Sequence, residues 1–119
     1  MDVEGYRQAW IARSRAEAEA TTRAATAVRA LLPDLVEILV ERFGATGVVL
    51  IGSLARNELT LRSDIDLVAA GVPNALFFKA GAALDRASGM HVDLIPWESA
   101  TPDMRAVVAA EGEVLHGRL

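Results

Sequence analysis

Hydrophobic and polar residues repeat with two different periods along the chain, and this contrast predicts where strands and helices lie. Val48–Ile51 is a short β-branched apolar run, which is typical of a buried strand. Asp64–Val68 alternates polar and apolar residues like a half-buried strand, so both of its aspartates lie on one face. Met90–Ile95 alternates in the same way and could pair beside it, and Glu113–His116 predicts a short closing strand.

Helical patterns occupy the segments between these runs. Pro33 begins a strongly apolar helix that Gly44 closes, and further helices are predicted over 75–87 and 102–110. We therefore expect an α/β (α+β) fold, with a small mixed β-sheet flanked by helices. We expect one domain over residues 1–119, in which residues 33–119 form the core and residues 1–32 form an N-terminal extension.

This extension is rich in Ala, Arg and Glu and predicts one long helix with a thin apolar face. Its larger apolar residues are Tyr6, Trp10, Val28, Leu31 and Leu32. Two alternatives remain open. The helix either packs back along the domain or presents a surface to a partner subunit, including a second copy of the chain.

Composition narrows the function classes. The chain has 119 residues, a formal net charge of −4 and no cysteine. The negative charge argues against a broad nucleic-acid-binding face. No apolar run is long enough to span a membrane, and residues such as Asp2 do not fit a signal peptide. We expect a soluble cytoplasmic protein without membrane partners.

A turn suited to phosphate follows the first strand. Gly52 lets the backbone turn without a Cβ clash, and Ser53 fits the N-cap of a following helix. The Ser53 hydroxyl and the free N–H groups of that helix end would form a site for phosphate oxygens. Asn57, later in the connection, tolerates turn geometry.

Carboxylates follow this turn. Asp64 and Asp66 repel each other when held side by side, so a cation is needed to neutralise them. Hard oxygen ligands of this kind suit Mg²⁺, with water and substrate phosphates completing the shell. Asp93 in the third strand is a candidate third carboxylate.

Gly52-Ser53, followed by Asp64-Ile65-Asp66, resembles the Gly-Ser and Asp-x-Asp pattern of the DNA polymerase β-like nucleotidyltransferase superfamily. The Gly-Ser-x-Ala-Arg motif is most similar to that of the minimal nucleotidyltransferases, including MntA-type antitoxins that accompany HEPN-domain toxins. The resemblance covers roughly residues 34–117 and leaves the N-terminal helix unexplained.

The resemblance implies a Mg²⁺-dependent enzyme with two metal ions and ATP as donor. It implies that Asp64, Asp66 and Asp93 are catalytic and metal-binding, and that Gly52 and Ser53 hold the nucleotide's phosphates. Asn57 stands where many relatives have Gly after the arginine, and it accepts left-handed backbone angles.

Several side chains keep two interpretations. Arg56, one helical turn after Ser53, either reaches a phosphate of the nucleotide or pairs with Glu58. Ser63 either caps the strand entry or touches a ligand, and Trp97 either closes the edge of the core or stacks on a base. His91 and His116, the only histidines, lie far apart and have no cysteine to join them in a zinc site.

Three functions follow from these residues and the resemblance. The first is transfer of a nucleoside monophosphate, AMP from ATP, to a hydroxyl of a partner protein, with the chain as antitoxin of a HEPN/MNT pair. The second is a non-catalytic module that neutralises a toxin by contact. The third is a nucleotidyltransferase acting on a small molecule such as an antibiotic.

Overall fold

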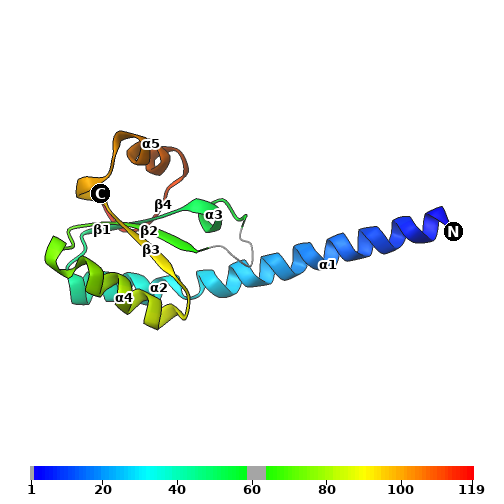
Figure 1. The fold of residues 1–119 in the computed structure, drawn as a ribbon, viewed down its shortest axis with the longest axis horizontal. Coiled ribbons are helices and arrows are strands. Elements are labelled where there is room, and N and C mark those ends of the chain that lie inside the picture. The colour runs from blue at the N-terminus through cyan, green and yellow to red at the C-terminus, as the bar shows by residue number, and fades with distance from the viewer. Residues whose placement is uncertain (1, 59–63) are drawn as a thin grey trace.

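The fold is built on a four-stranded mixed sheet, and the computed structural model describes residues 2–58 and 64–119 (Figure 1). The strand order is β3-β2-β1-β4. β1 runs antiparallel to β2 and β4, whereas β2 and β3 are parallel. The strands are β1 Gly47–Ile51, β2 Ile65–Ala70, β3 Val92–Pro96 and β4 Glu113–Gly117. The mixed sheet and the four predicted strands are confirmed.

Helices occur in every segment where the sequence pattern predicts one. The predicted helix over 75–87 begins as a 3₁₀ turn at Asn74–Leu76, and the helix that begins near Pro33 ends as a π-helical turn at Ile38–Arg42. Thr101 caps the last helix, because its hydroxyl accepts a bond from the Met104 N–H. The helices are α1 Val3–Arg29, α2 Leu32–Glu37, α3 Gly52–Ala55, α4 Phe77–Ser88 and α5 Pro102–Glu111.

The two faces of the sheet are covered by different helices. The main core lies on the face covered by α2 and α4, where the side chains of Leu35, Leu39, Leu50, Leu67 and Leu84 are fully buried. A smaller core on the other face joins Val49, Ile51 and Val68 to Met104 and Val108 of α5. Figure 1 shows α4 and α5 on opposite sides of the strands.

This double cover changes one expectation about β2. The alternation of Ile65, Asp66 and Leu67 is confirmed, since the two apolar residues are fully buried and Asp66 is only partly buried. Val68, on the same face as Asp66, is also fully buried, because α5 covers the second face there. The strand is therefore half-buried only at its first residues.

Helix α1 extends away from the sheet as a rod (Figure 1). Its Ala24, Ala25 and Val28 pack on the main core, whereas Tyr6 and Trp10 are 63% and 58% exposed. The molecule is 63 Å long and 30 Å wide as a result. The alternative in which the helix packs back along the domain is wrong, because too few large apolar side chains hold it there. None of the helices in residues 2–58 and 64–119 combines the length and the apolar character that a membrane-spanning segment needs.

Candidate active site

The turn between β1 and α3 brings backbone against a carboxylate. Gly52 has a φ of +79°, a left-handed value that glycine adopts without a Cβ penalty. A Cβ at this position would collide with Oδ2 of Asp66 and lie 3.2 Å from its Cγ. Glycine is therefore needed here for two reasons, its φ and its contact with Asp66.

The sheet register brings the candidate carboxylates to one end of one face. Asp66 is aligned with Ile51 on β1 and with Asp93 on β3. Asp64 directly precedes β2 and is exposed. The next residues on this face, Val68 and its neighbours, form the small core under α5. The predicted pairing of the Asp93 strand beside the Asp64 strand is confirmed. The carboxylates lie at the end of the face where buried residues give way to solvent-exposed ones.

The Asp66 carboxylate is affected electrostatically by the other two. Burial raises the pKa of Asp66 above the ordinary aspartate value, and the negative charges of Asp93 and Asp64 raise that pKa further. The positive charge of Arg56 acts in the opposite direction and is a smaller effect. Such uncompensated repulsion is what a bound cation would relieve.

The donor set fits Mg²⁺ in kind. Carboxylate oxygens are its preferred protein ligands, and usually only one or two of them bind the ion together with water and substrate phosphates. Across residues 2–58 and 64–119, no group of three acidic, histidine or cysteine side chains is arranged closely enough to hold an ion by itself. The protein therefore offers Asp66 and its neighbours as a partial set of ligands that a nucleotide's phosphates would complete.

Ser53 differs from its predicted place. The turn begins at Gly52 itself, so Ile51 occupies the N-cap position and Ser53 lies inside α3. The predicted N-cap role is wrong, because the positive φ of Gly52 starts the turn one residue earlier. A four-residue helix also aligns few peptide dipoles, so any phosphate binding here would depend on local N–H groups and the Ser53 hydroxyl.

Asn57 ends the turn in the conformation that the sequence predicts. It is the one non-glycine residue with positive φ among those described, at 57°. Three backbone bonds close the turn, from the N–H groups of Arg56, Asn57 and Glu58 to the carbonyls of Gly52, Leu54 and Ser53. The segment 52–58, which we call the phosphate turn after the role that the sequence predicts for it, is therefore compact.

Arg56 is engaged by two carboxylates. It lies 3.1 Å from Glu58 and 2.9 Å from Glu111 at the end of α5, and these bonds raise the pKa of Arg56. The predicted pairing with Glu58 is present, and the second partner, Glu111, comes from a distant part of the sequence. Ser63 lies outside the described residues.

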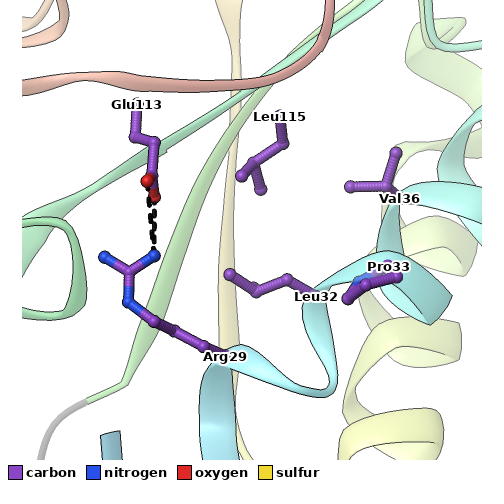
Figure 2. Close-up of a pocket in the computed structure, with 6 residues that line it drawn as sticks. All are labelled: Arg29, Leu32, Pro33, Val36, Glu113 and Leu115. Carbon is purple, nitrogen blue, oxygen red and sulfur yellow. Dashed lines mark hydrogen bonds and ion pairs between the residues drawn. The ribbon is translucent and has the colours of Figure 1, made fainter. Parts of the chain in front are cut away.

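Arg29 is a residue near this site that the sequence does not single out. It comes from the last turn of α1, forms an ion pair with Glu113 at 2.9 Å, and donates to the carbonyl of Leu54 and to Oδ1 of Asn57 at 3.1 and 3.3 Å. Figure 2 shows its side chain pointing at Glu113, and the two residues together line one side of a pocket of about 460 Å³. No local pattern distinguishes it from the other arginines of this helix.

The remaining candidates lie outside this cluster. Trp97 packs against the small core, and the Arg105 guanidinium lies 4.2 Å from its ring centre, so it closes the core edge. His91 is 3.6 Å from Asp85, and His116 is exposed on β4. His91 acts on the carboxylate cluster only weakly, because its charge lowers the pKa of Asp66 by less than the charge of Arg56 does.

Comparisons with known proteins agree with this geometry. Residues 32–115 match the family described as "Nucleotidyltransferase domain". No match was found among curated proteins. A solved minimal nucleotidyltransferase is 27% identical with a TM-score of 0.58, over 78% of this chain and 93% of that one.

Two further similar structures are toxin–antitoxin complexes. One contains AMP-PNP and is 22% identical with a TM-score of 0.64, over 71% of this chain and 73% of that one. The other is a tri-AMPylated Shewanella oneidensis HEPN toxin with its MNT antitoxin, 20% identical with a TM-score of 0.63, over 76% and 73%. At these identities the likeness establishes the fold. Because the family match spans more than half of its residues, this chain belongs to the nucleotidyltransferase domain family.

Proposed function

We propose that this chain transfers AMP from ATP to a hydroxyl of a partner protein, as the antitoxin of a HEPN/MNT pair. The observation that carries the proposal is the alignment of Asp66 with Asp93 beside a glycine turn that touches Asp66. The family supports nucleotidyl transfer. The similar complexes, one with AMP-PNP and one with an AMPylated toxin, support the donor and the acceptor.

The chain's residues have separate parts in this reaction. Asp64, Asp66 and Asp93 would hold Mg²⁺, and Gly52 and Ser53 would contact the triphosphate. When bound, Mg²⁺ neutralises charge on the phosphates and orients them. The acceptor oxygen forms a bond to the α-phosphorus, the bond from that phosphorus to the pyrophosphate oxygen breaks, and Asp93 accepts the hydroxyl proton.

Arg56 has a smaller place in this proposal. Its two ion pairs hold the guanidinium near the turn, and it acts on the Asp66 carboxylate through its charge. Its bonds to Glu58 and Glu111 use Nε and Nη1, so contact with a phosphate would use other donors of the guanidinium or displace one of these carboxylates. We therefore assign Arg56 to shaping the turn and balancing its charge, with nucleotide contact as a further step.

Calorimetry with ATP and Mg²⁺ tests the nucleotide site. Wild-type protein should bind in a metal-dependent manner, and the double variant Asp64→Asn, Asp66→Asn should not. Incubation of a HEPN-type partner with α-labelled ATP then tests transfer, and label should appear on the partner only with the wild-type chain. Absence of nucleotide binding by folded wild-type protein, alone and with the partner, would contradict the proposal.

One observation favours the contact-only alternative. Trp10 and Tyr6 are exposed on α1, about five and six turns from Val28 on the same face, so the face that packs on the core continues into solvent. Such a surface would bind a partner protein without catalysing a reaction on it. If the Asp66→Asn variant controls the toxin as well as the wild type does, contact is the mechanism.

A further inference from the structure

Helix α1 contributes a side chain to the phosphate turn although the family match begins only after it, at residue 32. Its Arg29 contacts three separate parts of the fold. The ion pair joins it to β4, and the two other bonds join it to the Leu54 carbonyl in α3 and to the Asn57 side chain. The segment outside the family match is thus connected directly to the candidate site.

The contacts to the turn are separable from the ion pair. Glu113 binds mainly Nη1 of Arg29, whereas Nη2 donates to Leu54 and Asn57. A guanidinium is planar and presents its donors in a fixed fork, so one orientation serves both sets of partners. A lysine could keep the ion pair but has no such fork.

The two acceptors, the Leu54 carbonyl and the Asn57 side chain, belong to residues that determine the backbone shape of the turn. The Leu54 carbonyl also accepts the Asn57 N–H, so Arg29 binds an oxygen that already closes the turn. Asn57 holds the left-handed φ at the end of the turn, and Arg29 binds its side chain. Gly52 contacts Asp66 at one end of the turn, and Arg29 donates to Leu54 and Asn57 toward the other end.

The ion pair between Arg29 and Glu113 contributes little to the stability of the fold by itself. Arg29 and Glu113 are 32% and 45% exposed, and solvent weakens ion pairs with this exposure, so they add little to stability. We propose that Arg29 is a positioning residue, which holds the phosphate turn in its binding shape and makes α1 part of the nucleotide site. The dependence of nucleotide affinity on Arg29 rests on the proposed function, whereas the shape of the turn does not.

Amide hydrogen exchange tests the shape of the turn without nucleotide. In the Arg29→Lys variant, the amides of Arg56, Asn57 and Glu58 should exchange about three- to tenfold faster, which corresponds to the loss of about one hydrogen bond. The amides of β1 should be unchanged. Glu113→Gln removes the ion pair but leaves both acceptors in the turn, and should exchange like the wild type.

Calorimetry with ATP and Mg²⁺ gives the second readout on the same full-length variants. Arg29→Lys should weaken binding about three- to tenfold, in proportion to the faster exchange. The matched control is Arg23→Ala, which removes an exposed arginine from the same helix and should bind as the wild type does. A melting curve for each variant separates local loosening from unfolding.

The two readouts together separate the role of Arg29 from the proposed function. If the wild type binds nucleotide but Arg29→Lys matches it in exchange and affinity, Arg29 does not position the turn. Arg29 is also not the positioning residue if Glu113→Gln loosens the turn as much as Arg29→Lys, because the ion pair then carries the effect. If the wild type binds no nucleotide, the proposed function fails, and exchange at residues 56–58 alone decides whether Arg29 shapes the turn.

Discussion

Gly52 and Asp66 are in such close contact that the turn after β1 and the carboxylate of β2 form one unit. The backbone of the turn has no room for a side chain on that side, and the Asp66 carboxylate is placed directly against it. In the proposed reaction, this contact fixes the distance between the phosphates and the metal ligands. Four measurements test this and related features.

Replacing Gly52 with alanine should destabilise the protein and abolish nucleotide binding. The change imposes a left-handed φ on alanine and a collision with Asp66, and backbone strain of this kind costs on the order of 1–3 kcal/mol. Urea unfolding measures the loss. The matched control is Gly81→Ala in α4, where a Cβ meets open space and alanine is the better helix former, by roughly 1 kcal/mol. Equal effects at both glycines would contradict the contact with Asp66.

The raised pKa of Asp66 predicts how stability depends on pH in metal-free protein. Between the ordinary aspartate pKa and the raised one, the folded state keeps a proton that the unfolded state has lost. The free energy of unfolding therefore falls as pH rises through this window, and above it the loss is complete and no longer changes with pH.

Asp66→Asn removes this penalty. Relative to wild type, the variant should gain stability as pH rises through the window, as measured by urea unfolding at a series of pH values with a metal chelator. A stability difference that is independent of pH would show that Asp66 is not perturbed by burial and by Asp93.

Asn57 should be replaceable by glycine but not by alanine. Both variants lose the bond from Arg29, but only alanine also bears the strain of the left-handed backbone, which costs roughly 1–2 kcal/mol in a residue with a Cβ. Thermal unfolding of Asn57→Ala and Asn57→Gly measures the difference. If the Asn57→Ala variant is as stable as the Asn57→Gly variant, Asn57 does not have a left-handed conformation.

The fluorescence of Trp10 tests whether α1 projects into solvent. The variant Trp97→Phe keeps Trp10 as the only tryptophan, and its fluorescence should be strongly quenched by acrylamide because its side chain is exposed. The reverse variant, Trp10→Phe, leaves the half-buried Trp97 beside Arg105, which should be quenched less. Equal protection of both tryptophans would mean that α1 folds back on the domain.

The sequence predicts the strands, because alternation along a strand is a local signal, and it offers the Asp93 strand as a neighbour of the Asp64 strand. The register that aligns Asp66 with Asp93 is seen only in the structure. It also predicts the left-handed Asn57, because few other residues accept that backbone. It does not predict the full burial of Val68, which depends on α5 covering the second face.

Two other features depend on contacts between distant residues or on a single backbone angle. The start of α3 at Gly52 follows from one φ value, whereas serine next to a strand end is a familiar N-cap signal. The roles of Arg29 and Glu111 require the helix ends to be placed in space. A thin alanine face gives no local indication of whether α1 packs or projects.

The projecting helix also makes the size of the particle in solution informative. The radius of gyration of the Cα atoms is 17.7 Å. A compact chain of this length would have about 13.5 Å. Small-angle scattering can therefore distinguish an extended α1 from one that has collapsed onto the sheet, without a label or a substitution. The same measurement, repeated as a partner protein is added, would show whether the complex is more compact than the projecting α1 alone allows, as expected if the partner packs around this helix.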